Sequence, residues 1–449
     1  MRGQSRRSAP LSTELRRFGF CLIALALAFP ARAGEVAEDF AFRLQATYIG
    51  QSKRAFSAAY TGANSLVPQR EFSRTFTSTL YAGWRLTPDT ELYVNPEAAL
   101  GVPLSRLSGL GGFTNNEIAR SSGPDLRVYR ARVFVRHTWG VGGDTEWLEP
   151  GQNQLAGKAD VNRVVFTAGN LSAIDVFDAN AYSHEPRRQF INWSLVTHGA
   201  WDYPADARGY TWGAALEYLA EGWALRAGRF MQPRQSNGLP LNPHILESYG
   251  DAAEWQHEYS IAGRRGTLRL LAFRNVAAMG NFRSSIENAP NTGGLPDLSV
   301  GRVSRSKVGA GVNIEQSVAQ HAGAFVRASR HDGETETYAF TEIDRSLSAG
   351  FVLDGALWGG GGDTVGLAFV RNGLSGPHRD YLARGGLGFF LGDGRLNYRP
   401  EQTIEGFYSR QLARALWVSL DYQRIRNPGY NADRAGPVNV WSLRLHSEF

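Results

Sequence analysis

Hydrophobic and polar residues alternate with a period of two over many short stretches of this 449-residue chain. In 39–49, Phe40 and Phe42 would share one face of an extended strand, with Arg43 on the other. The final stretch, 437–449, alternates in the same way and ends on an aromatic residue. Period-two alternation is typical of β-strands. The pattern therefore predicts an all-β chain.

The links between the alternating runs are of two kinds. Tight turns such as 87–90 and 263–266 alternate with long polar connections, which are 51–72, 99–126, 170–207, 233–253, 277–304, 331–343 and 427–436. Bacterial outer-membrane β-barrels show this asymmetry, with short turns on the periplasmic side and long loops outside. One link, 140–160, contradicts it, because it is long where a short turn is expected.

The number of strands is tested by parity. Seventeen runs have strand character, but two periplasmic chain ends require an even number. The weakest run, 385–394, is interpreted as part of a long external loop over 373–401. The prediction is a transmembrane antiparallel β-barrel of about sixteen strands. The run 437–449 pairs with 39–50, so that no strand edge faces lipid, and Phe449 lies at the membrane interface, where aromatic residues gather.

The first 33 residues have the layout of a secretory signal peptide. An arginine-rich start precedes an apolar run at 18–29 and the sequence Ala31-Arg32-Ala33, which predicts cleavage after Ala33 and a mature barrel over 34–449. The apolar run is too short for a transmembrane helix, and no later stretch is apolar for 18 residues. These 33 residues hold six arginines against one glutamate, so the mature net charge falls from +6 to about +1. Nothing in that charge predicts a nucleic-acid partner.

A sixteen-stranded barrel is wide enough for an aqueous channel. Inward-facing polar residues are then the candidates for the solute path, and these are Tyr93, Asn95, Glu97, Arg130, Arg132, Arg136, Glu405 and Asp421. The three arginines alternate along 128–139, and the Gly-rich loop 99–126 could fold into the lumen beside them. The planar fork of arginine suits bidentate contacts with pairs of oxygens, such as vicinal sugar hydroxyls. The alternative is a solvated charged wall, and for Glu405 and Asp421 a plain hydrophilic lining is the preferred interpretation.

No catalytic or metal-binding motif emerges from the sequence. H-E-x-x-H and G-x-S-x-G are absent, and the only cysteine, Cys21, lies in the predicted signal peptide, which excludes a thiolate metal site. Ser183, His184 and Glu185 are consecutive, but neighbours along an extended chain point in opposite directions. We therefore expect an ordered loop there, with neither enzymatic activity nor a cofactor.

Several separated motifs resemble the carbohydrate-selective porins of the OprB type. They are "GLGGFTNNEIAR" at 109–120, "NLSAIDVFDANAYSHEPRRQFINWSLVTHGAWDYPADARGYTWG" at 170–213, "QTIEGFYSRQL" at 402–412 and "YQRIRNPGYNADRAGPVNVWSLRLHSEF" at 422–449. The resemblance runs from about Thr79 to Phe449. It implies a sixteen-stranded outer-membrane barrel that passes mono- or small oligosaccharides by diffusion, with Arg130, Arg132 and Glu97 near the constriction in contact with sugar. Ser447 departs from the small apolar or aromatic residue that the family has at this position.

Two other functions are weighed against a sugar porin: a general porin and a channel that exports polysaccharide. A polysaccharide exporter should have a continuous basic path, whereas a sugar porin should mix arginines, acids and aromatics. The near-zero mature charge and the expected proximity of Glu97 to Arg130 favour the sugar porin. The sequence leaves open which sugar passes and whether the barrel is a monomer or a trimer.

Overall fold

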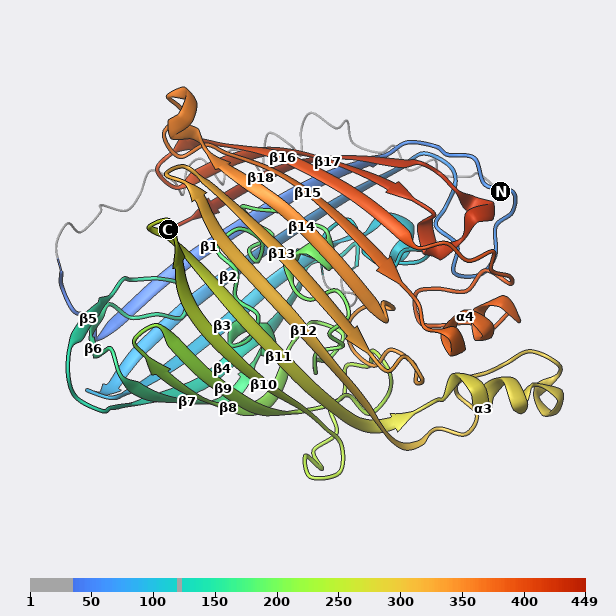
Figure 1. Ribbon diagram of the computed structural model, residues 1–449, viewed down its shortest axis with the longest axis horizontal. Coiled ribbons are helices and arrows are strands. Elements are labelled where there is room, and N and C mark those ends of the chain that lie inside the picture. The colour runs from blue at the N-terminus through green and yellow to red at the C-terminus, as the bar shows by residue number, and fades with distance from the viewer. Residues whose placement is uncertain (1–34, 119–122) are drawn as a thin grey trace, which may run out of the picture.

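The protein is a closed antiparallel barrel, shown in Figure 1. The computed structural model describes residues 35–118 and 123–449, so the predicted signal peptide, 1–33, lies outside the described residues. The barrel strands are β1 (Phe40–Lys53), β2 (Glu71–Thr87), β3 (Thr90–Val102), β4 (Arg127–Gly140), β7 (Arg163–Leu171), β8 (Thr211–Ala220), β9 (Trp223–Met231), β10 (Tyr249–Ile261), β11 (Arg264–Met279), β12 (Val303–Ala319), β13 (Ala322–His331), β14 (Arg345–Asp354), β15 (Thr364–Gly373), β16 (Glu401–Ala413), β17 (Leu416–Arg426) and β18 (Val438–Glu448). The predicted all-β fold with sixteen barrel strands is confirmed.

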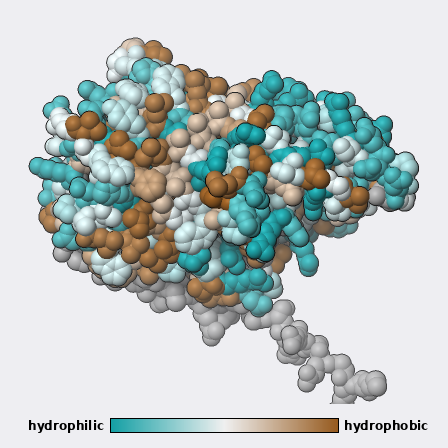
Figure 2. All heavy atoms as spheres, turned by 90° about the horizontal axis from the view of Figure 1, so that it is seen from below, coloured by the Kyte–Doolittle hydropathy of each residue, from teal (hydrophilic) through white to brown (hydrophobic). Residues whose placement is uncertain are grey.

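The period-two pattern sorts the side chains between the two faces of the wall. On β15, Leu367 and Phe369 are 43% and 41% exposed and face outward, whereas Val370 on the inner face is fully buried. Figure 2 shows one face of the molecule, where apolar side chains lie over the barrel wall and the end that carries the long loops is mostly hydrophilic. A barrel embedded in lipid requires an apolar band on its outer face, around a polar interior.

The first and last strands close the barrel. β1 and β18 pair from Gln45 opposite Glu448 to Lys53 opposite Val440. Phe449 extends the ladder, because its N–H donates to the Leu44 carbonyl at 2.8 Å and its own carbonyl accepts from the Leu44 N–H at 3.0 Å. The last residue therefore satisfies backbone groups at the seam of the wall.

Two links depart from the regular alternation of short turns and long loops, and the sequence had marked both. The long link after β4 contains a separate hairpin of β5 (Thr145–Leu148) and β6 (Gly157–Asp160), which belongs to a second, two-stranded sheet. Between β15 and β16 the chain forms α4 (Gly376–Ala383) and irregular structure rather than a strand, which confirms the assignment of 385–394 to a loop. None of the helices in the described ranges is long and apolar enough to cross a membrane.

The interior is filled by chain from two of the long loops. We call 172–210, between β7 and β8, the lumen loop; it includes α2 (Trp193–Val196). Residues 103–118, after β3, run beside it, and Phe113 contacts Trp193 with ring centroids 5.3 Å apart. The described part of the loop after β3 thus folds inward, a possibility that the sequence left open. The longer inward segment, however, is the lumen loop, which the sequence indicated only as an ordered connection.

Candidate functional site

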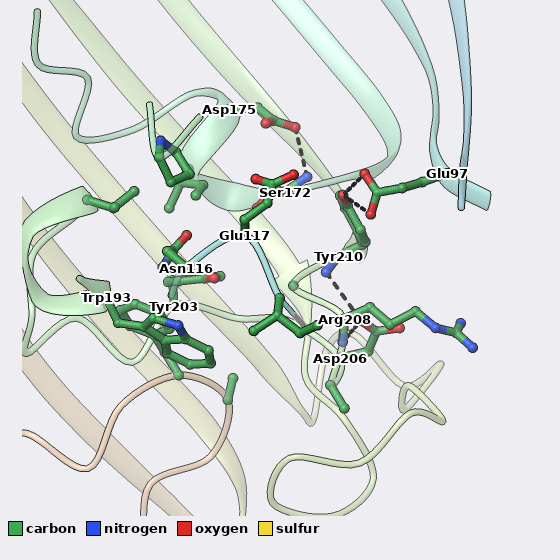
Figure 3. A pocket seen from close by; sticks show the side chains of 18 of the residues that line it. Glu97, Asn116, Glu117, Ser172, Asp175, Trp193, Tyr203, Asp206, Arg208 and Tyr210 are labelled. Carbon is green, nitrogen blue, oxygen red and sulfur yellow. Dashed lines mark hydrogen bonds between the residues drawn. The ribbon is translucent and has the colours of Figure 1, made fainter. Parts of the chain in front are cut away.

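A polar cavity of about 180 Å³ lies between the wall of β3 and β4 and the two inward loops. Figure 3 shows acidic side chains such as Glu97 and Glu117 together with the aromatic residues Tyr203 and Tyr210 around it. Its charged and hydroxyl-bearing lining comprises Glu97, Glu117, Tyr129, Arg132, Ser172, Asp175, Glu185, Arg187, Tyr203, Asp206, Arg208 and Tyr210. The cavity therefore mixes guanidinium groups, carboxylates and phenol rings, and a neutral polar solute can hydrogen-bond to all three.

Arg132 is fixed at one side of the cavity by a bidentate ion pair. Its Nε and Nη2 each donate to a carboxylate oxygen of Asp175 at 2.7 Å. The backbone N–H of Ser172 also donates to Asp175, at 2.9 Å. The guanidinium lies 5.1 Å from the ring centroid of Tyr210. A fork-to-fork pair with a stacked ring holds Arg132 in one orientation, while its side chain keeps 14% of its surface exposed.

Arg187 of the lumen loop forms a second ionic group. Its Nε lies 3.0 Å from an oxygen of Glu117, and its Nη1 lies 3.4 Å from an oxygen of Glu185. Glu117 also accepts a hydrogen bond from the hydroxyl of Thr77. Burial raises the pKa of Glu117 to about 6, against the opposing effect of Arg187. For Glu185 burial also acts to raise the pKa, but Arg187 and its backbone N–H outweigh it and the pKa is lowered.

Glu97 lies on the wall and is held by three hydroxyl groups. Thr79 donates to it at 2.8 Å, Tyr210 donates at 3.2 Å, and Tyr129 donates as well. Figure 3 shows the hydroxyl of Tyr210 directed at this carboxylate. Tyr210 thus links Glu97 with Arg132, because its hydroxyl contacts one and its ring the other.

The predicted inward orientation of Arg130 is wrong. The β3–β4 register shifts between Asn95 and Pro96, so that Asn95 lies opposite Arg132 but Pro96 lies opposite Arg130. Arg130 is exposed on the outer face, where its guanidinium lies 5.2 Å from the centroid of the exposed Trp212 ring. The shift is a β-bulge, which adds one residue to β4 and reverses the alternation beyond it. For the same reason Tyr129, expected on the apolar face, points inward.

Tyr93, Asn95 and Arg136 face inward as predicted but do not line this cavity. The link between β4 and β7 covers two of them: the Tyr93 hydroxyl accepts from the N–H of Leu155 at 3.1 Å, and Arg136 donates to the carbonyl of Asn153 at 2.9 Å. Tyr93 and Asn95 are almost fully buried. Their part in a solute path remains a prediction that their burial does not favour.

Glu405 and Asp421 also face inward, yet the lumen loop covers them. The N–H groups of Ile191 and Asn192 donate to the two oxygens of Glu405, at 2.5 and 3.0 Å. Both acidic residues are at most 1% exposed. Instead of a hydrophilic lining open to water, both are buried, and Glu405 anchors the loop to the wall.

Sequence reasoning missed most of the cavity's charged groups. Arg187, Glu185 and Asp175 lie in the lumen loop, and Glu117 lies in the loop after β3. These residues do lie in the family motifs at 109–120 and 170–213. In a loop, however, side chains do not alternate between two faces, so the sequence does not predict which of them point into the lumen. In the same loop, Ser183 donates its hydroxyl to the Leu195 carbonyl at 2.7 Å, which is a structural contact. Within the described residues, no group of three or more His, Cys, Asp or Glu could hold a metal ion.

A closed sixteen-stranded barrel with inward loops around an ionic cavity defines a porin of the bacterial outer membrane, which is a channel protein and not an enzyme. Residues 63–449 match the family model described as carbohydrate-selective porin, OprB family, and the chain belongs to that family. A search of curated proteins found no match.

Among solved structures, the chain is similar to OprB of Pseudomonas putida in its high-pH structure. The TM-score is 0.68 at 16% sequence identity, covering 92% of this chain and 94% of that one. It is also similar to the outer membrane channel DcaP of Acinetobacter baumannii, with a TM-score of 0.51 at 10% identity, covering 94% and 99% of the two chains. At these identities the likeness concerns the fold.

Proposed function

We propose that this porin passes mono- or small oligosaccharides by passive diffusion, and that the cavity around Arg132 and Arg187 is its selective constriction. One observation carries the proposal: both arginines are paired with carboxylates in a partly exposed cavity of about 180 Å³ that is also lined by phenol rings. Neighbouring donors and acceptors match vicinal hydroxyls, which donate and accept at once. A phenol ring offers a surface for the apolar face of a sugar ring. Family membership supports the same class of solute.

Binding in the constriction must be weak, because a solute has to leave as readily as it enters. A few charge-assisted hydrogen bonds in competition with water would give a millimolar dissociation constant, about −4 kcal/mol. The ion pairs serve this need, since each carboxylate competes with the sugar for its arginine. A continuous row of unpaired arginines would favour an acidic polymer, whereas the pairing in this cavity favours neutral sugars over the polysaccharide-export alternative.

Planar-bilayer conductance with sugar titration tests the proposal. We expect glucose or another small sugar to reduce the ion current at tens of millimolar, roughly ten times the estimated dissociation constant. The general-porin alternative expects no such block. If none of a panel of mono- and disaccharides reduces the current of the unmodified channel, the sugar-selective hypothesis is wrong and the general-porin alternative is favoured.

Arg130 and Arg132 form a matched pair for a sharper test, because they lie two residues apart on one strand and face opposite sides. Arg132→Gln should weaken sugar block roughly tenfold, since a hydrogen bond to a charged group contributes about 1.5 kcal/mol or more. Arg130→Gln should leave block and conductance unchanged. Equal effects of the two substitutions would contradict the assignment of the constriction.

A further inference from the structure

The outer face of the wall carries a row of arginines at the end where the long loops emerge. On each of four strands, exposed arginines lie on the loop side of the outward apolar residues. On β13, Arg330 lies beyond Val326 and Ala328, and on β14, Arg345 lies beyond Leu347. On β15, Arg371 lies beyond Leu367 and Phe369, and on β17, Arg424 and Arg426 lie beyond Leu420 and Tyr422. These strands follow one another in the barrel, with only β16 between the last two. We call Arg330, Arg345, Arg371, Arg424 and Arg426 the arginine rim.

Strand register brings the members of the rim together. Arg330 lies directly opposite Arg345 in the β13–β14 ladder. Arg371 lies opposite Leu347, diagonal to Arg345, and across β16 Gln402 lies opposite both Arg371 and Arg426. Like charges directly opposite one another destabilise a strand pair. An anion between the guanidinium groups would remove that repulsion.

In the described part of the protein no rim arginine forms an ion pair with a carboxylate. The Arg345 guanidinium donates to the Tyr398 hydroxyl at 3.4 Å. Asp332, two residues beyond Arg330, accepts from the backbone N–H of Val308 at 2.7 Å. On another wall, by contrast, outward Arg229 of β9 is paired with Asp251 of β10, Nε to Oδ1 at 2.7 Å. The rim arginines therefore lack the carboxylate partner that an outward arginine has elsewhere on the barrel.

We propose that the arginine rim binds the phosphate groups of a phosphorylated lipid in the outer leaflet of the membrane. Its position fits, because the guanidinium groups lie at the loop end of the apolar band, where headgroups meet the acyl chains. Guanidinium forks bind phosphate oxygens in bidentate fashion. The outward apolar residues below each arginine are placed to contact the acyl chains of the same lipid, which a free phosphate ion would leave uncovered.

Native mass spectrometry of the folded, full-length mature barrel in detergent, titrated with lipid A, tests the proposal. Each arginine near a membrane surface contributes roughly a fivefold gain in affinity for anionic lipid, so the triple variant Arg330→Gln, Arg345→Gln, Arg371→Gln should bind lipid A about 100-fold more weakly. The matched control replaces exposed arginines at the turn end, as Arg264→Gln, Arg265→Gln, Arg410→Gln, and should keep the wild-type affinity. Dephosphorylated lipid A should bind the wild type as weakly as the triple variant binds lipid A.

Three lipid-binding results would overturn the proposal: unchanged binding by the triple variant, an equal loss in the control variant, or equal binding of the dephosphorylated lipid. Competition by millimolar inorganic phosphate as effective as that by lipid would show a free-anion site instead and also overturn it. Folding of the triple variant is judged by its migration in SDS without boiling. If it does not fold, lipid A binding by the three single variants and binding of dephosphorylated lipid A by the wild type still test the proposal. Sugar block is a separate readout, because the rim lies outside the lumen.

Discussion

A single residue, Ala131, decides which arginines of β4 reach the lumen. The ladder with β3 pairs Arg132 with Asn95 and Arg130 with Pro96, so Ala131 is left without a partner. Its carbonyl accepts instead from the side-chain amide of Asn170 at 2.6 Å, which fixes the bulge. Because side chains in a strand alternate with a period of two, one extra residue reverses the direction of all that follow.

At the same scale, Glu117 should make ion selectivity depend on pH. Its pKa of about 6 means that the carboxylate becomes protonated as the pH falls from 7 to 5. The constriction then loses one negative charge beside Arg187, so the ratio of cation to anion permeability should decrease. Reversal potentials in a salt gradient measure this ratio. Glu117→Gln should show the low-pH selectivity at every pH; a transition near pH 6 that survives in this variant would assign it to another group.

The element that shapes the channel is the lumen loop, which buried carboxylates and arginines fasten to the opposite wall. Glu405 on β16 accepts from Ile191 and Asn192, and Arg327 on β13 lies 3.1 Å from an oxygen of Asp178. Such contacts compensate the burial of charges on the wall. The loop is thereby held as a second layer inside the barrel.

Glu405→Ala should loosen the lumen loop without opening the barrel. Removing the acceptor leaves two buried N–H groups without a partner, which costs about 1–3 kcal/mol each. We expect higher and noisier single-channel conductance and weaker sugar block. Glu221→Ala, in the exposed turn between β8 and β9, is the control and should behave as wild type. If the Glu405→Ala channel has the same conductance and current noise as the wild type, the other contacts are sufficient to hold the loop.

At the scale of the whole molecule, closure makes the barrel kinetically robust. The β1–β18 ladder and the Phe449–Leu44 backbone pair leave no open edge in the wall, and opening it in lipid would expose unsatisfied backbone groups at several kcal/mol each.

We expect the mature chain to begin at Gly34 and the barrel to migrate differently in SDS before and after boiling. The cleavage site is expected from the signal-peptide layout of 1–33. The change in migration is expected because the closed wall should resist SDS until the sample is boiled. Intact-mass measurement of protein extracted from outer membranes tests the cleavage site, and Met1 retained there would contradict it. Identical migration of boiled and unboiled samples would contradict the kinetic stability.

Local patterns along the chain were enough to predict the barrel. Alternation, link lengths and parity gave sixteen strands, the loop at 385–394 and the closing partner of 437–449, because strand direction and membrane sidedness are local, periodic properties. It also placed Glu97 and Arg132 on the inner face. Which inward residues reach water depends on long-range contacts in the folded chain. Arg130 was turned outward by a bulge that leaves no periodic signal, and Glu405 and Asp421 were covered by a loop folded from the far wall. Arg187, Glu117 and Asp175 entered the site from irregular backbone, whose direction depends on contacts distant in sequence rather than on any local pattern.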